Sequence, residues 1–450
     1  MREKTAKEAI QLSDHFTYKK LIRFVASPII MMVFTSIYGI VDGLFVSNMV
    51  GKYAFVALNF VYPFIMILGG TGFMIGTGGS ALVAKELGRG NKEKADRYFT
   101  MMIIVTVILG AVITPIGMFA VRPVAKLFGA TEAFLEDSVL YGRIVIGFTT
   151  AFMLQNVFQS FLTVAEKPKL GLLITVIAGV TNAILDALFM AVFKWGLVGA
   201  AVATGIGQLV GGIIPIVYFC GKKEKLIKLV KTKLEIRPIL QAMTNGSSEL
   251  MSNISMSIVG MLYNAQLIKY AGENGVAAYG TIMYVQFIFN AIYIGYAIGS
   301  APIISYHYGA ENKAELKSML KRSVTLIGAA SLVLTATAIA AASPLSKIFV
   351  GYDKELLEVT VHGMRIFAVS FLLSGLNIFA SSFFTALNNG LISAIISFMR
   401  TLVFQTAAVL FLPYALGLDG IWWAITIAES SAFVMSLGFV FGKRKKYGYM

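Results

Sequence analysis

Long apolar runs recur along the whole chain, and short segments that hold most of the charged residues separate them. Each run is long enough to cross a bilayer as a helix, which takes about 20 residues. A membrane β-strand needs only about ten, and a helix satisfies its own backbone hydrogen bonds in lipid. The pattern predicts an all-α integral membrane protein with twelve transmembrane helices near 24–47, 55–84, 96–121, 135–161, 169–193, 197–219, 240–267, 276–305, 323–343, 358–387, 390–416 and 419–441.

The composition supports a membrane protein. Apolar residues make up 57% of the 450 residues and charged residues only 14%, whereas soluble domains are about half apolar and about a quarter charged. This excludes a soluble enzyme, a disulfide-stabilised scaffold and a disordered protein. The single cysteine, Cys220, cannot form an internal disulfide or a multi-thiolate metal site.

The distribution of Lys and Arg predicts the orientation. The chain termini and alternate loops hold 28 of the 38, the remaining loops hold 7, and 3 lie within spans. Cytoplasmic loops are rich in Lys and Arg, so we expect a multi-pass protein of the cell membrane with both termini cytoplasmic. The net charge of +15 then reflects these loops and indicates no nucleic-acid partner.

The two halves of the chain are related by a repeat. A shift of 221 residues aligns Gly78 with Gly299, Gly88 with Gly309 and Asn156 with Asn377, without gaps across six spans. Because six is an even number, both halves have the same orientation, as in transporters built from parallel repeats. The sequence predicts two six-helix bundles, at 1–220 and 239–450, joined by a cytoplasmic linker at 221–238, and alternating access between them.

Polar side chains in the first half share one depth in the membrane. Ionisable residues within spans are costly and indicate function. Counted from the outer span ends at about 1.5 Å per residue, Asp42, Asp186 and Thr204 lie at similar depth, and Asn182 lies one turn from Asp186. Their oxygens suit Na⁺, and two close carboxylates also suit H⁺. We expect a cation or proton site there and no other metal.

The second half lacks this site. The repeat replaces Asp42 by Tyr263 and removes the other three polar side chains. Arg400 and Glu429 lie about ten residues inside spans 11 and 12, and we expect a buried ion pair, with a second titrating acid as the alternative. Glu249, early in span 7, could cap, pair or gate, and the sequence leaves its role open.

Catalytic motifs are absent from the sequence. There is no GxxxxGK[ST] phosphate-binding loop, no HExxH, and no recognisable pair of nucleophile and base, while the three histidines are scattered. The protein is therefore expected to be no enzyme and to need no resident cofactor. An ion gradient, of Na⁺ or of H⁺, is expected to supply the energy.

Taken together, Ser27-Pro28, Asp42 followed by Gly43 and Gly51, and the two six-span halves resemble the multidrug and toxic compound extrusion (MATE) family. The resemblance to its DinF-type branch implies that Asp42, Asn182, Asp186 and Thr204 form an N-lobe cation site. It also implies efflux of small organic cations by antiport with H⁺ or Na⁺, without an obligate protein partner. Candidate substrate residues near that site are Tyr38, Gln155, Asn156, Gln159 and Gln208.

Other classes of protein stay open at this point. A related flippase for lipid-linked oligosaccharides or polysaccharides would need basic residues for a pyrophosphate, and Arg143 and Arg365 keep that alternative open. An integral-membrane enzyme acting on lipid lacks a catalytic constellation in this sequence. A passive channel lacks a selectivity ring. The sequence also does not identify the substrate, the coupling ion or the oligomeric state.

Overall fold

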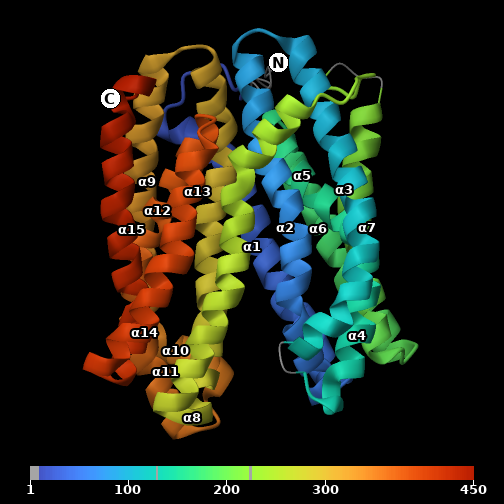
Figure 1. Ribbon diagram of the computed structural model, residues 1–450, viewed down its shortest axis with the longest axis vertical. Coiled ribbons are helices and arrows are strands. Elements are labelled where there is room, and N and C mark those ends of the chain that lie inside the picture. The colour runs from blue at the N-terminus through green and yellow to red at the C-terminus, as the bar shows by residue number, and fades with distance from the viewer. Residues whose placement is uncertain (1–9, 128–129, 222–224) are drawn as a thin grey trace, which may run out of the picture.

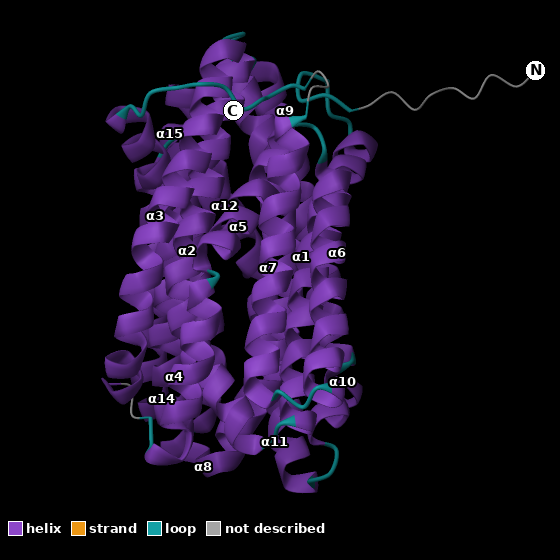
Figure 2. Cartoon of the chain, turned by 90° about the vertical axis from the view of Figure 1, so that its right-hand side faces the viewer, coloured by secondary structure: helices purple, strands orange, loops and turns teal. Residues whose placement is uncertain are grey.

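The computed structural model describes residues 10–127, 130–221 and 225–450, which form helices and connecting loops without a strand (Figures 1 and 2). The N-terminal half contains α1 (Tyr18–Met49), α2 (Lys52–Gly88), α3 (Lys92–Leu127), α4 (Glu132–Gly147), α5 (Thr149–Val164), α6 (Pro168–Asp186), the π-helical turn η1 (Ala187–Val192) and α7 (Gly196–Cys220). The C-terminal half contains α8 (Ile236–Gly309), α9 (Lys313–Ala340), α10 (Ala342–Val350), α11 (Lys354–Phe367), η2 (Ala368–Ser370), α12 (Phe371–Ala386), α13 (Gly390–Phe398), the π-helical turn η3 (Met399–Phe404), α14 (Gln405–Leu416) and α15 (Leu418–Tyr447).

These helices supply the twelve expected spans. The 74 residues of α8 would extend about 111 Å as one straight helix, far more than a bilayer. Gly272 has φ 61° and ψ −151° and breaks α8 into two spans. A bend of 55° at Phe148 divides another span into α4 and α5. The prediction of an all-α membrane protein with twelve spans is confirmed.

The N-terminal half forms one lobe, the N-lobe, and the C-terminal half forms the other, the C-lobe. The two lobes are in contact near the end of the molecule that holds both termini, here called the terminal face (Figure 1). A Cβ on Gly88 would overlap the Tyr306 carbonyl oxygen, and a Cβ on Gly309 would overlap that of Lys85. The repeat relates these two contacts, because Gly309 follows Gly88, and Tyr306 follows Lys85, by 221 residues. Two further glycines, Gly78 on α2 and Gly246 on α8, bring the backbones of the lobes equally close. Glycine is required here because any side chain would separate the lobes.

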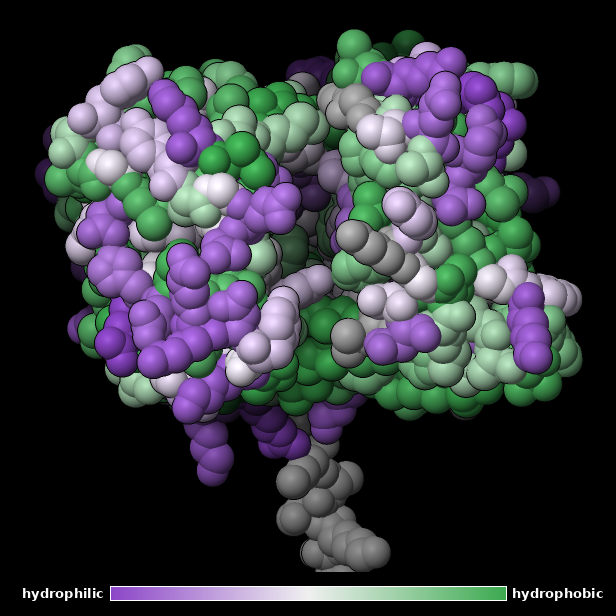
Figure 3. Space-filling view, turned by 90° about the horizontal axis from the view of Figure 1, so that it is seen from below, coloured by the Kyte–Doolittle hydropathy of each residue, from purple (hydrophilic) through white to green (hydrophobic). Residues whose placement is uncertain are grey.

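The lobes are apart at the opposite face. Figure 3, which views that face, shows a hollow between the two masses. Gly39 and Gly260, which the repeat also relates, would meet no atom within 4 Å if a Cβ were added. The structure is therefore closed at the terminal face and open at the opposite one.

A short segment before α1, residues 10–17 and here called the strap, joins both lobes at the terminal face. The Leu12 N–H donates to Glu166 Oε1 (2.6 Å) in the loop between α5 and α6. The Phe16 N–H donates to Glu315 Oε1 (2.9 Å) on α9. Leu12 and Phe16 are fully buried in one hydrophobic cluster with residues of α9 and α12. The strap thus crosses from the N-lobe to the C-lobe where the lobes are closed.

Replacing Glu315 by Ala is expected to lower the thermal stability of the protein. Glu315 Oε2 also lies 2.7 Å from His15 Nδ1, and hydrogen bonds to charged groups are worth about 1.5–3 kcal/mol each. We expect a loss of about 3 kcal/mol, measured by thermal unfolding of the purified protein. Glu358→Ala, an exposed acid on α11, is the control, and an equal effect of both changes would contradict the role of the strap.

Candidate functional site

Three helices of the N-lobe bring oxygen-bearing side chains to one layer. Asp42 lies seven residues before the end of α1, Asp186 six before the end of η1, and Thr204 eight after the start of α7. At 1.5 Å per residue these positions are about 9–12 Å from the helix ends at the opposite face. Asn182 lies one turn earlier on α6 than Asp186. The structure therefore places the four residues in the half of the N-lobe where the lobes separate.

The two carboxyl groups of this layer carry no compensating cation. Asp42 and Asp186 are close enough for each to feel the charge of the other. Asp186 is fully buried, and neither of its oxygens has a hydrogen-bond partner among the described residues. The same holds for Asp42 Oδ1. Burying charge without a partner is unfavourable, so this pair is suited to taking up a proton or a cation.

Helix packing also brings neutral polar side chains to this layer. A Cβ on Gly207 of α7 would lie 3.1 Å from the Asn182 Cβ, so the glycine lets α7 approach α6 closely at this level. Within the described part of the chain, Asn182 Nδ2 and Thr204 Oγ1 are shielded from solvent and have no hydrogen-bond partner. The backbone widens into the π-helical turn η1 directly after Asp186, and such turns are frequent at functional sites.

Three tyrosines surround the carboxyl groups. Tyr38, from α1, and Tyr62, from α2, lie close enough to interact with the charge of Asp42. The buried Tyr141 of α4 lies against Thr204 and interacts with both carboxyl groups. Tyr62 and Tyr141 were not among the residues predicted for this site. The depth comparison would have found them, because each lies six or seven residues inside its predicted span.

The structure places the candidate substrate residues on α1, α5 and α7. Tyr38 lies near the side chain of Gln155. Gln155 packs on α7, where a Cβ on Gly211 would lie 2.7 Å from its Cδ. The amides on α5 and α7 are all buried, and each has a side-chain atom without a partner among the described residues: Gln155, Asn156, Gln159 and Gln208. Of these residues, Tyr38 interacts with Asp42, and Gln155 lies beside Tyr38.

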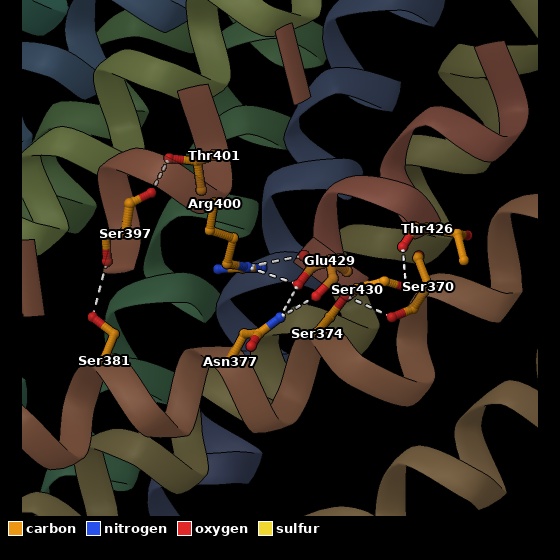
Figure 4. A network of polar contacts seen from close by, with 10 residues as sticks. All are labelled: Ser370, Ser374, Asn377, Ser381, Ser397, Arg400, Thr401, Thr426, Glu429 and Ser430. Atoms are coloured by element: carbon orange, nitrogen blue, oxygen red, sulfur yellow. Dashed lines mark hydrogen bonds and ion pairs between the residues drawn. The ribbon is translucent and has the colours of Figure 1, made fainter. Parts of the chain in front are cut away.

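The C-lobe holds a buried acid that is paired with a guanidinium (Figure 4). Arg400 Nε donates to Glu429 Oε1 and Oε2 at 2.9 and 3.0 Å, and Asn377 Nδ2 donates to Glu429 Oε2 at 2.7 Å. Glu429 is fully buried. The repeat relates Glu429 to Gln208, Asn377 to Asn156 and Arg400 to Gly179. The same framework therefore holds an ion pair in one lobe and unpaired carboxyl groups in the other.

Other side chains of the C-lobe complete this difference. Tyr263, the counterpart of Asp42, is buried and stacks on Tyr279 with ring centroids 4.9 Å apart. Glu249 is half-buried on α8 and close enough to interact with Arg400. The C-lobe thus has a stacked tyrosine pair where the N-lobe has Asp42, and its acids Glu249 and Glu429 lie near the guanidinium of Arg400.

The two arginines that would serve a flippase lie outside this network. Arg143 is exposed on α4, and its Nε donates to the Met118 carbonyl oxygen of α3 at 3.3 Å. Arg365 is exposed on α11. The structure therefore does not bring Arg143 and Arg365 to the carboxyl pair.

A membrane protein with two repeat-related six-span lobes, closed at one face and open at the other, has the architecture of a secondary transporter. The family model MatE matches residues 28–188 and 250–409, one segment in each lobe. The chain belongs to this MATE family of membrane transporters, as the sequence predicted, and is not an enzyme.

Two kinds of relatives agree with this assignment. The multidrug export protein MepA of Staphylococcus saprophyticus is 25% identical over 421 residues, which cover 92% of this chain and 91% of that protein. An outward-facing multidrug resistance MATE transporter of the MOP superfamily superposes with a TM-score of 0.91 at 23% identity over the full length of both chains. A MOP superfamily transporter from Pyrococcus furiosus, described as having a binding pocket of reverse polarity, superposes with a TM-score of 0.89 at 24% identity over 98% of both chains. At these identities the superpositions establish the fold alone.

Proposed function

We propose that this protein exports small organic cations across the cell membrane by antiport with Na⁺ or H⁺, through the N-lobe site. The observation that carries the proposal is the buried pair Asp42 and Asp186, which has no compensating cation among the described residues. An acidic site attracts cations, and the names of the MepA relatives support drug-like substrates. The confinement of the site to the N-lobe supports the DinF-type branch.

Competition for one pair of carboxyl groups would couple the two movements. A cationic substrate and the coupling ion each neutralise Asp42 and Asp186, so each weakens the binding of the other by the same factor. Tyr38 can stack on an organic cation beside the pair. Ion uptake from outside would then release substrate from the state that is open at the opposite face. No resident cofactor is needed for this exchange.

Both candidate ions suit the residues of the site. Carboxylate, amide and hydroxyl oxygens from Asp42, Asn182, Asp186 and Thr204 are ligands for a hard cation such as Na⁺. Two adjacent carboxyl groups also hold a proton readily, because like charges disfavour double ionisation. Transport driven separately by a Na⁺ gradient and by a pH gradient therefore distinguishes the two ions.

Export also requires a defined orientation in the membrane. The excess of Lys and Arg in the terminal loops and the linker, 28 against 7, supports a cytoplasmic terminal face. The open face would then be extracellular, and the structure would represent an outward-facing state, ready to release substrate and bind the ion.

The test uses purified protein in liposomes loaded with a fluorescent organic cation, with a Na⁺ gradient and a pH gradient imposed separately. We expect one gradient to drive dye movement, and Asp42→Asn or Asp186→Asn to reduce it about tenfold or more, within the range of allosteric coupling energies. Because these changes remove unpaired buried charge, we expect no loss of thermal stability.

Glu358→Gln is the matched control, because it also removes one acid but at an exposed position on α11. Full gradient-driven transport by the Asp42→Asn, Asp186→Asn double variant would refute the proposal. Failure of the wild type to move the dye under either gradient would point instead to an anionic, lipid-linked substrate.

A further inference from the structure

A cationic pocket of about 390 Å³ lies at the terminal face, away from the N-lobe site. The first turns of α3 and the linker before α8 form its walls. Four of the seven lining residues are basic and two are acidic: Lys92, Arg97, Lys228 and Lys231 against Glu93 and Asp96, with Val230. The pocket therefore carries a net positive charge.

The linker is fixed against α3, so the pocket is a built feature. The Lys228 N–H donates to Asp96 Oδ1 (2.8 Å), and the Val230 N–H donates to Thr100 Oγ1 (3.0 Å). Ile227, directly before Lys228, is fully buried in the hydrophobic core of the N-lobe. These contacts position Lys228 and Lys231 over the start of α3.

The two acids of the pocket compensate only part of the charge of its four basic side chains. None of the four forms an ion pair with another described residue, although Asp96 attracts Lys92 and Lys228 at longer range. Arg97 Nε is shielded from solvent and has no hydrogen-bond partner in the described part of the chain. A guanidinium nitrogen in that position favours an anionic acceptor.

The repeat relates the walls of this pocket to residues of the C-lobe that contact the C-terminal segment. Lys92 corresponds to Lys313, which packs against Gly448. A Cβ added to Gly448 would lie 2.7 Å from the Lys313 Cδ. The next residue, Tyr449, corresponds to Lys228 and is fully buried. The C-terminal residues thus occupy the region of the C-lobe that corresponds to the pocket.

We propose that the pocket of Lys92, Arg97, Lys228 and Lys231 binds a phosphate group, carried by an anionic lipid headgroup or free in solution. Arg and Lys recognise phosphate oxygens by charge-assisted hydrogen bonds. Basic pockets at the cytoplasmic ends of spans bind lipid headgroups. Leu234 and Ile236 follow in the linker and at the start of α8 and are exposed, as expected beside acyl chains. A bound phosphate would hold the linker, and so the connection between the lobes, to α3.

The test is native mass spectrometry of the full-length protein in detergent with phosphatidylglycerol and phosphatidylcholine. We expect wild type to retain phosphatidylglycerol and Arg97→Gln, Lys228→Gln to bind it about tenfold or more weakly, since each basic residue near an anionic surface contributes about a factor of five. Lys317→Gln, Lys321→Gln is the matched control, because these exposed lysines occupy the corresponding turns of α9. Lys92→Gln, Lys231→Gln, at two other residues of the pocket, is used if the first variant does not fold.

Inorganic phosphate distinguishes the two sources. Displacement of phosphatidylglycerol by millimolar phosphate, only where the pocket is intact, would support a site for the phosphate group itself. Resistance to phosphate together with loss in the pocket variant would support a site for the lipid. Equal loss in the pocket variant and in the α9 control, or loss in neither, would overturn the proposal.

Discussion

Replacing Glu429 by Gln is expected to destabilise the protein by about 3–5 kcal/mol, the cost of leaving one member of a buried ion pair without its partner. Glu429 is fully buried and accepts from both Arg400 and Asn377. Gln keeps the shape and the hydrogen bond to Asn377, so the effect reports the charge. Thermal and denaturant unfolding of the purified variant measure it.

A second replacement separates the charge from the packing. Arg400→Met together with Glu429→Gln removes both charges, and buried ion pairs can be replaced by neutral side chains at little cost. We expect the double variant to recover most of the stability that Glu429→Gln loses. Unchanged stability of the Glu429→Gln variant, or a double variant less stable than the single one, would show that the Arg400 charge does not need Glu429 as its partner.

The contrast with Asp186 makes this prediction specific. Glu429→Gln removes a charge that has a partner, whereas Asp186→Asn removes one that has none among the described residues. The first change is expected to affect stability and the second transport. The sequence already indicated this difference, because the repeat leaves Asp42, Asn182, Asp186 and Thr204 without counterparts, whereas Arg400 and Glu429 were expected to form a buried ion pair.

The fold followed from the sequence where a single physical rule decides it. Apolar runs of sufficient length must become helices in lipid, so all twelve spans were predictable, and an ungapped repeat required two parallel lobes. The break of α8 at Gly272 also fell between the predicted spans 240–267 and 276–305.

Other features depend on contacts that no local pattern reports. The bend at Phe148 has no proline beside it, and Gly205 of α7 packs so close to the Phe148 ring that an added Cβ would overlap it. The strap comes from a polar segment whose partners, Glu166 and Glu315, are 154 and 299 residues away. Tyr62 and Tyr141 join the N-lobe site from spans without an ionisable acid in their middle. Long-range packing fixes all of these features.

Replacing Gly309 by Leu is expected to abolish transport while the protein stays folded. Gly309 lies against the Lys85 carbonyl of α2, and the repeat-related Gly88 lies against Tyr306. A side chain there would separate the lobes at the terminal face and disfavour the closed state by about 1–3 kcal/mol, typical of overpacking. Since each 1.4 kcal/mol is a factor of ten, the population of the state open at the opposite face falls about fivefold to 150-fold relative to the state open at the terminal face.

Cysteine labelling tests the direction of this shift. With the exposed native Cys220 changed to Ser, a cysteine at the buried Ala242, which faces Gly78, reports on the closed contact. We expect a water-soluble thiol reagent to label Ala242→Cys rapidly with Gly309→Leu and slowly without it. Gly328→Leu on α9, where an added Cβ meets no atom within 4 Å, is the matched control. Because lobes that part at the terminal face must expose Ala242, slow labelling in an inactive Gly309→Leu variant would mean that the glycine contacts do not control closure.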